Sequence, residues 1–355
     1  MSEARTLRIL VTGVGAPPGL AALRSLASSG LDVELLAADA APYAAGLYEP
    51  DVEAVILPSA RDSELYRSTV RRLSVERDVD IVLPGSEAEA GALAPVAAQW
   101  REEGVEVPVP APDVLHYGID KGALLERIIA LGLPAPKTLR VEREADLGQW
   151  DGGYPCVLKP RSSRGARGVS YPDDAAALVR DWRRTSAAEG PCLVQSYIPG
   201  GAETVYTVGA VFLQGRLILS TVHHKLATNP PSGGAATAGQ TVIDEPIRKA
   251  GLAILDATGP WHGFAAVELK RSTPDAEPKL LEINPRLWGF AQMMTLAGVN
   301  APAMLVRALR GDFDAADPPP GLTQYRPIRV LRTWHDREMP AGAEPEDLRS
   351  RDWPE

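Results

Sequence analysis

The chain has 355 residues, of which 45% are hydrophobic and 23% charged, a composition typical of globular proteins with two or three domains. A formal net charge of -9 at pH 7 excludes the broad basic surface that nucleic acid or an anionic membrane requires. No apolar run approaches the ~18 residues that cross a bilayer, and no apolar signal segment precedes the first predicted strand. We therefore expect a cytoplasmic protein that binds neither nucleic acid nor membranes.

Apolar strands alternate with helical patterns at the start of the chain. Such alternation predicts a parallel, doubly wound sheet, that is, a Rossmann-like α/β domain over residues 1–112 that ends in a proline-rich loop. We expect strands at 7–12, 33–38, 52–57 and 81–83, and helices at 20–28, 63–75 and 88–100.

The first predicted strand leads into the glycine-rich segment 13–19, and Asp39 stands 20 residues beyond Gly19. That spacing is similar to the dinucleotide-binding fingerprint, in which an acid binds the ribose. The third glycine comes one residue late, however, and Pro17 and Pro18 remove N–H donors that a pyrophosphate would need. A nicotinamide-dependent oxidoreductase is therefore an alternative that we rank low.

Glu87 follows the fourth predicted strand, in the segment Gly85-Ser86-Glu87. Ligands bind at the carboxyl ends of the strands in such sheets, so Glu87 is a candidate for binding a substrate ammonium group. The alternative is a solvated helix start with Ser86 as its N-cap.

The next segment, 121–168, contains a helix, an apolar strand that carries a lysine, and a loop of small residues. A helix is expected at 121–130, and Lys159 ends an apolar strand that begins near 154. A lysine in an apolar strand is costly unless its ammonium group meets an anion, here a phosphate. The loop 161–168, which contains Ser162, Gly165 and Gly168, could fold over phosphates with its backbone N–H groups; the alternative is a basic surface turn.

Cys156 and Cys192 lie in apolar runs and predict free buried thiols.

A second loop, 221–235, combines cations with small residues and is a candidate lid over a reaction site. Lys225 or His223 could contact a phosphate there, with Ser232 and Gly233 beside the substrate. Neighbouring residues on a strand point to opposite faces, so at most one of His223 and His224 reaches the site.

Three polar residues interrupt the apolar pattern of two further strands, 264–270 and 280–284. The turn between these strands predicts an antiparallel pair, in which Glu268 comes level with Glu282 and Asn284 shares the face of Glu282. Two carboxylates and an amide oxygen are hard ligands that suit Mg²⁺. Arg286 could clamp a phosphate or a carboxylate. The alternative is an edge strand with a solvated face.

The segment 282–289, Glu-Ile-Asn-Pro-Arg-Leu-Trp-Gly, resembles the ATP-grasp superfamily, whose metal-binding strand pair ends in Glu-x-Asn. It is most similar to the branch of the carbamoyl-phosphate synthase large chain and the PylC-type ligases. The resemblance implies an ATP-grasp fold of two α+β subdomains behind the Rossmann-like domain. We expect these subdomains at 113–198 and 199–325, followed by a strand and tail at 326–355.

The same resemblance implies roles for individual residues. Lys121 and Lys159 match the two lysines that bind nucleotide phosphates, and main-chain groups at Tyr197 and Ile198 match the hinge that reads adenine. Glu203 matches the acid that binds the ribose, whereas Gln195 stands where a Glu is usual. The implied cofactors are ATP and Mg²⁺, with Mn²⁺ as a substitute.

The implied reaction is ligation of a small carboxylate to an amine through an acyl phosphate, with release of ADP and phosphate. Lys159, Lys225 and Arg286 are the expected catalytic residues, and Glu87, Arg286, Trp288, Gly289, Ser232 and Gly233 the expected substrate contacts. A homodimer is a further expectation. A carbamoyl-phosphate or carboxyphosphate synthase is the nearer alternative, although the chain has no glutaminase half. A regulatory nucleotide-binding protein is disfavoured because the acidic metal ligands are present.

Overall fold

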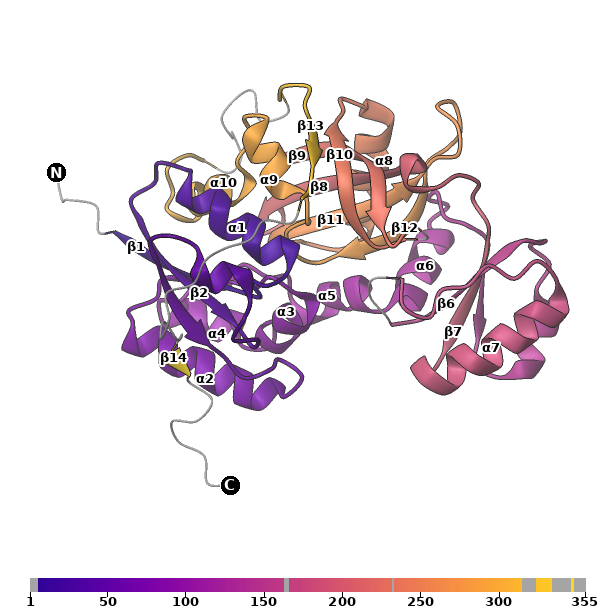
Figure 1. Cartoon of the computed structure of the whole chain (residues 1–355), viewed down its shortest axis with the longest axis horizontal. Helices are drawn as coiled ribbons and strands as arrows, with labels where there is room; N and C mark the ends of the chain where they lie inside the picture. The colour runs from indigo at the N-terminus through magenta and orange to yellow at the C-terminus, as the bar shows by residue number, and fades with distance from the viewer. Residues whose placement is uncertain (1–5, 163–165, 232, 315–323, 334–345, 348–355) are drawn as a thin grey trace.

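The computed structural model describes residues 6–162, 166–231, 233–314, 324–333 and 346–347 (Figure 1). These residues form three sheets of five, six and three strands. Sheet and helix elements are therefore arranged as the predicted α/β domain followed by two α+β units.

The five-stranded sheet is parallel, in the order β14-β3-β2-β1-β4. Its strands are β1 Leu7–Thr12, β2 Val33–Asp39, β3 Val52–Ile56, β4 Ile81–Leu83 and β14 Glu346–Asp347. The helical elements of this region are α1 Pro17–Ala27, η1 Ala45–Tyr48, α2 Ser63–Glu76, α3 Glu87–Leu93 and α4 Ala97–Glu102. The strand β14 brings a distant segment of the chain back to β3, next to the expected N-terminal domain.

Two predicted elements are wrong. The segment predicted as a loop and candidate lid over 221–235 is strand as far as Asn229, because Arg216–Asn229 and Ala235–Thr241 form an antiparallel strand pair.

The other wrong element is a helix. The sequence pattern suggested a single helix over 88–100, whereas α3 ends at Leu93 and α4 begins at Ala97. Pro95 lies in the break, since proline offers no N–H to a helix and its ring clashes with the preceding turn. The break leaves α3 short, with its first turn at the carboxyl end of β4.

The three-stranded antiparallel sheet has the order β5-β7-β6 and its own small core. Its elements are β5 Thr138–Val141, η2 Glu144–Gln149, β6 Cys156–Pro160, α7 Ala175–Glu189 and β7 Cys192–Ser196. Cys156 and Cys192 are buried and free, as predicted. Figure 1 shows this unit projecting from the rest of the molecule, with α7 on its outer side.

The six-stranded antiparallel sheet has the order β12-β11-β8-β9-β10-β13. Its strands are β8 Val205–Leu213, β9 Arg216–Asn229, β10 Ala235–Thr241, β11 Gly263–Lys270, β12 Lys279–Asn284 and β13 Arg329–Leu331. The other elements of this region are η3 Ala202–Thr204, α8 Glu245–Thr258, α9 Ala291–Leu296 and α10 Ala301–Leu309.

Two helices connect the parallel sheet to the antiparallel units: α5 Pro112–Ile119 and α6 Lys121–Ala130. Leu124 and Ile128 of α6 are buried in the same core as Val208 and Ile254, beside the six-stranded sheet. The start of α6 is thereby fixed at the edge where β12 lies.

The parallel sheet and the six-stranded sheet share a second core. Helix α1 packs against α9 and α10, and Leu26 and Val11 belong to the same apolar cluster as Met294 and Phe264. This shared core holds the carboxyl end of the parallel sheet next to the segment after β12. Within the described residues, no helix is long and apolar enough to cross a membrane.

Candidate active site

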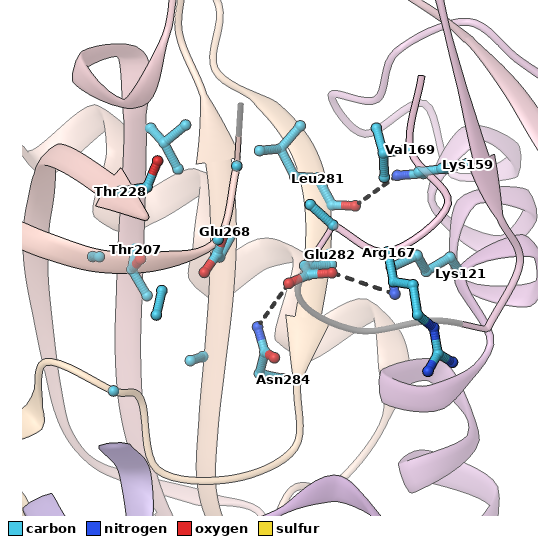
Figure 2. Close-up of a pocket in the computed structure, with 18 of the residues that line it drawn as sticks. Lys121, Lys159, Arg167, Val169, Thr207, Thr228, Glu268, Leu281, Glu282 and Asn284 are labelled. Atoms are coloured by element: carbon cyan, nitrogen blue, oxygen red, sulfur yellow. Dashed lines mark hydrogen bonds and ion pairs between the residues drawn. The ribbon is translucent and has the colours of Figure 1, made fainter. Parts of the chain in front are cut away.

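The predicted pair of acidic strands is present. Strands β11 and β12 are antiparallel, Glu268 lies opposite Glu282, and Asn284 lies opposite Ala266. Figure 2 shows Glu268, Glu282 and Asn284 close together, and the Asn284 amide donates to Glu282 Oε1 at 3.3 Å. Alternation along β12 therefore sets the two side chains on one face, as expected.

Each carboxylate of this pair binds a lysine from another strand or helix. Lys225 Nζ on β9 lies 2.7 Å from Glu268 Oε2, and Lys121 Nζ on α6 lies 3.3 Å from Glu282 Oε2. Burial favours the protonated form of Glu282, but the ammonium groups of Lys121, Lys159 and Lys225 outweigh it and hold its pKa below the usual range. Glu282 is therefore ionised at neutral pH.

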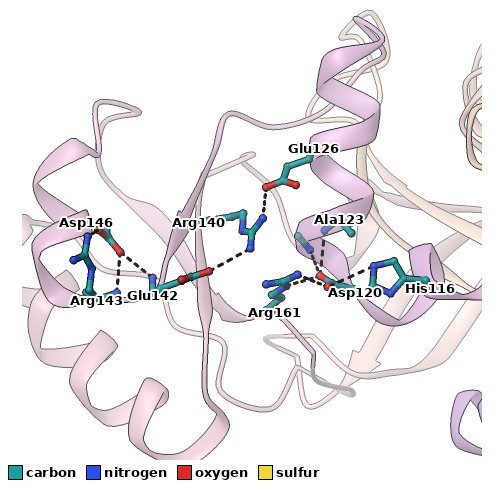
Figure 3. A network of polar contacts seen from close by, with 10 residues as sticks. His116, Asp120, Ala123, Glu126, Arg140, Glu142, Arg143, Asp146 and Arg161 are labelled. Atoms are coloured by element: carbon teal, nitrogen blue, oxygen red, sulfur yellow. Dashed lines mark hydrogen bonds and ion pairs between the residues drawn. The ribbon is translucent and has the colours of Figure 1, made fainter. Parts of the chain in front are cut away.

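Lys121 is placed by the cap of its helix. Asp120 accepts hydrogen bonds from the backbone N–H groups of Gly122 and Ala123, at 2.9 and 3.1 Å, and so caps α6. The same carboxylate binds the Arg161 guanidinium through contacts of 2.6 and 2.5 Å (Figure 3). Arg161 therefore holds the small sheet to α6, and it is not a free cation of the phosphate loop.

Lys159 lies near the end of β6, and its Nζ donates to the backbone oxygen of Leu281 at 3.3 Å. Burial and the neighbouring Lys121 lower the pKa of Lys159 to about 8, although Glu282 acts in the opposite direction. An anion placed beside this ammonium group would relieve both effects. The position is suited to a phosphate.

Arg286 connects the acidic strands to the parallel sheet. Its Nε donates to Glu87 Oε1 at 2.7 Å, and its Nη2 donates to Asn284 Oδ1 at 2.9 Å. Ser86 accepts a hydrogen bond from the backbone N–H of Glu89 and caps α3, as the alternative interpretation of this segment predicted. Glu87 nevertheless faces the site, so Ser86 caps α3 while the Glu87 carboxylate binds Arg286.

The donor set fits a hard divalent cation. In the described part of the chain no three His, Cys, Asp or Glu side chains gather, so the candidate set is two carboxylates and the Asn284 oxygen. Mg²⁺ prefers oxygen ligands and usually keeps several waters beside a few protein ligands. Glu268 and Glu282 would supply the charge that such an ion requires.

These side chains line one cavity of about 1430 Å³. The predicted residues that line it are Glu87, Lys121, Lys159, Ser162, Gln195, Tyr197, Ile198, Lys225, Gly233, Glu268, Glu282, Asn284, Arg286, Trp288 and Gly289. Gly168 and Glu203 are not among the lining residues. Glu203 is exposed, and its Oε1 accepts from the Gly201 N–H at 2.8 Å. Gly165 and Ser232 lie outside the described residues.

The hinge region lines one end of this cavity. The Tyr171 and Tyr197 rings meet edge to face with centroids 5.9 Å apart, and Lys270 Nζ lies 5.4 Å from the Tyr197 ring centre. The Gln195 amide nitrogen donates to Thr138 Oγ1 at 2.8 Å, so its carbonyl oxygen is left as an acceptor. Aromatic faces with a nearby acceptor suit a flat heterocycle that carries an amino group.

Some residues that line the cavity were not predicted from the sequence. Lys270 stands two residues after Glu268, and the period of a strand could have placed both on one face. Tyr171, Arg332 and Phe290 lie in loops, where no periodic pattern applies. Thr207 is a single small polar residue in an apolar strand and gives no signal by itself.

The glycine-rich segment after β1 binds its own neighbours. Asp39 Oδ2 accepts from the backbone N–H of Gly15 at 2.8 Å, and Asp39 Oδ1 accepts from that of Ala41 at 2.9 Å. Pro17 and Pro18 form the first turn of α1, where they offer no N–H to a pyrophosphate. The carboxylate that suggested a ribose contact is thus used within the fold.

Comparisons with known proteins agree with this geometry. Residues 191–330 match a family described as ATP-grasp in the biosynthetic pathway with Ter operon. The chain is similar to carnosine synthase 1 of Gallus gallus, with 31% identity over 44% of this chain, and to a D-alanine–D-alanine ligase of Stutzerimonas stutzeri, with 29% identity over 38% of it. It spans only 18% and 44% of the length of these two relatives.

Solved structures share the fold of this chain. An L-amino acid ligase from Bacillus licheniformis superposes with a TM-score of 0.67 at 19% identity, covering 90% of this chain and 78% of that one. The biotin carboxylase domain of a Hydrogenobacter thermophilus 2-oxoglutarate carboxylase, solved with MgADP, gives 0.68 at 15% identity, covering 91% and 72%. Residues 191–330 therefore match an ATP-grasp model, and the chain has the fold of these solved structures, with the paired acidic strands and the lysines that face them in place.

Proposed function

We propose that the chain is an ATP-dependent carboxylate–amine ligase that forms an amide through an acyl phosphate and releases ADP and phosphate. The observation that carries the proposal is the facing pair Glu268 and Glu282, each bound to a lysine, in the same cavity as Lys159 and Arg286. Carboxylates that bind mobile lysines can exchange them for a metal ion, and the freed lysines can then bind phosphate.

The chemistry assigned to the chain is positioning and charge neutralisation. Lys121 and Lys159 bind the nucleotide phosphates, and Lys225 and Arg286 neutralise the transferring phosphoryl group and the carboxylate that attacks it. Mg²⁺ held by Glu268, Glu282 and Asn284 would supply charge neutralisation on phosphate oxygens. The acyl phosphate is then attacked by an amine, and a C–N bond forms as the C–O bond to phosphate breaks. No covalent bond to the protein is required.

We propose amino acids as the substrates. The names of the similar proteins, an L-amino acid ligase, a D-alanine–D-alanine ligase and a carnosine synthase, support this class. Glu87 and Arg286 bind each other at 2.7 Å in the cavity, and their charges match the ammonium and carboxylate groups of an amino acid. Mn²⁺ in place of Mg²⁺ and a homodimer are further proposals.

The test is phosphate release from ATP and Mg²⁺ in the presence of single amino acids and small carboxylates, with the nucleotide product identified. With ¹⁸O in the carboxylate, label is expected in inorganic phosphate alongside equal amounts of ADP. AMP and pyrophosphate as products would contradict the acyl-phosphate route. Consumption of reduced nicotinamide without ATP would support the oxidoreductase alternative instead.

A further inference from the structure

The sheet face that carries the acidic pair continues across two more strands. Thr207 on β8 lies opposite Glu268, and His223 on β9 lies opposite Thr207. Residues directly opposite each other on neighbouring strands share a face. Glu282, Glu268, Thr207 and His223 therefore form one row, and all four residues line the cavity. Figure 2 shows Thr207 beside Glu268.

Trp288 covers the far end of this row. A methyl group added at Gly209, two residues after Thr207 on β8, would lie 2.6 Å from three atoms of the indole ring. The Trp288 and His223 rings are 6.5 Å apart between centroids and nearly parallel, at 26°. Gly209 thus makes room for the indole to lie against the sheet beside His223.

Four polar atoms in this region have no hydrogen-bond partner among the described residues: Thr207 Oγ1, His223 Nδ1, Trp288 Nε1 and Thr221 Oγ1. The first three belong to residues that line the cavity and are only 2% exposed, whereas Thr221 does not line it. Buried polar groups are normally paired, and an unpaired one is destabilising. The three groups that line the cavity offer a ligand hydrogen bonds that the protein itself does not make.

The three unpaired polar groups that line the cavity carry no charge themselves, which limits the ligand that they can pair with. Burial, together with Lys225 and His224, lowers the pKa of His223 to about 3, so its imidazole is neutral at pH 7. A carboxylate or phosphate would pair better with the lysines and Arg286 that line the cavity elsewhere. The nearest carboxylate of the row, Glu268, is already bound to Lys225 at 2.7 Å, so a buried amine beside Thr207 and His223 is favoured in its neutral form over its ammonium form.

We propose that Thr207, His223 and Trp288 form the subsite for the neutral primary amine of the acceptor substrate. This inference rests on the proposed ligase function. The two N–H bonds of the amine donate to Thr207 Oγ1 and His223 Nδ1, which leaves the nitrogen lone pair free to attack the acyl carbon. As the C–N bond forms and the C–O bond to phosphate breaks, one of these protons leaves with the released phosphate. The indole N–H of Trp288 donates to an oxygen of the same substrate.

The experiment separates binding of the amine from formation of the acyl phosphate. The chain is incubated with ATP, Mg²⁺ and the standard L-amino acids in two parallel reactions, one of which contains saturating hydroxylamine, so that the acyl phosphate is trapped as a hydroxamate even where hydroxylamine, itself a small amine, binds the subsite weakly. Dipeptides are measured by mass spectrometry and hydroxamate by its iron(III) complex. Thr207→Val is expected to lower the ratio of dipeptide to hydroxamate about tenfold, because one hydrogen bond to the amine is lost.

Thr221→Val is the matched control. Thr221 on β9 is fully buried and its hydroxyl also has no partner among the described residues, but it does not line the cavity. It is expected to leave the ratio unchanged. His223→Asn and His224→Asn form a second pair, because His224 is on the opposite face of β9, where its ring stacks on Tyr206.

The outcomes distinguish failure of the amine subsite from failure of the proposed ligase function. A ratio that stays constant in Thr207→Val and His223→Asn, or that falls equally in Thr221→Val and His224→Asn, overturns the amine subsite and leaves the ligase function standing. If the unmodified chain forms neither hydroxamate nor dipeptide, the proposed function fails, and the subsite fails with it.

Discussion

The carboxyl end of the parallel sheet and the cavity face of the six-stranded sheet both carry carboxylates, but these carboxylates bind different partners. Asp39 accepts two hydrogen bonds from the backbone, and Glu89 is buried at the start of α3. Glu268 and Glu282 instead bind the side chains of Lys225 and Lys121.

These different partners allow the two regions to be distinguished by mutation. A carboxylate bound to the backbone is fixed with the fold, and its removal should change stability. A carboxylate bound to a flexible lysine can exchange that partner for a metal ion, and its removal should change turnover. Both regions line the same cavity, so position alone does not separate them.

The largest effect is expected for Glu282→Gln, which keeps the shape of the side chain and removes its charge. Turnover should fall at least about 100-fold while the melting temperature stays close to that of the parent, because a metal ligand is lost and the fold is not. Glu277→Gln, at an exposed position in the turn of the same strand pair, is the control. Full ATP-dependent activity in Glu282→Gln would show that the acidic pair is not the metal site.

The carboxyl end of the parallel sheet can be tested through the effect of Glu89 on stability. Burial raises its pKa to about 7, with the Asp39 carboxylate adding to the effect and the hydroxyls of Ser86 and Thr12 opposing it. The folded chain therefore keeps a proton that the unfolded chain has already lost, so this carboxyl lowers stability as pH rises from about 4.5 to about 7.

Glu89→Gln should remove that decline, which is on the order of 2–3 kcal/mol. Urea unfolding at pH 5 and pH 8 measures it, and the exposed Glu64→Gln serves as the control. An equal pH dependence in Glu89→Gln and the parent would show that Glu89 is not a buried acid of the fold.

Lys159 should make nucleotide binding depend on pH. Its pKa is about 8 in the free protein, lowered by burial and by Lys121, and a bound phosphate favours the protonated form. Affinity for ATP with Mg²⁺ should therefore fall as pH rises through 8, by up to about tenfold between pH 8 and pH 9, with uptake of up to one proton.

Titration calorimetry in buffers of different ionisation enthalpy measures both the affinity and the proton uptake. Lys159→Arg, whose guanidinium stays charged, should bind with no such dependence. A parent affinity that is constant from pH 7 to pH 9 would contradict the phosphate role of Lys159.

The smallest effect is expected for Asp39→Ala. Loss of the hydrogen bonds to Gly15 and Ala41 should lower the free energy of unfolding by about 1 kcal/mol and leave turnover within about twofold. Thermal unfolding and phosphate release, measured on one preparation, give both numbers. A large loss of turnover with unchanged stability would show that Asp39 acts in the reaction and not in the fold.

The local elements were largely predictable from residue patterns. Alternating strands and helices predicted the parallel sheet, and the turn between 270 and 279 predicted that Glu268 and Glu282 face each other, as the register confirms. The predicted helix over 88–100 failed at Pro95, where the apolar pattern continued although the backbone could not. Patterns of period 2 and 3.6 depend on near neighbours, so they describe elements better than the breaks between them.

By itself the sequence determined the fold class, the acidic pair and the position of Lys159 in an apolar strand, because each depends on neighbours along the chain. The tertiary structure alone decided which side chains from distant strands meet. It brought Lys225 to Glu268, Lys121 to Glu282 and Arg286 to Glu87, and it placed Trp288 over Gly209 and beside His223. Strand order and the shared core set these contacts, and no short-range pattern encodes strand order.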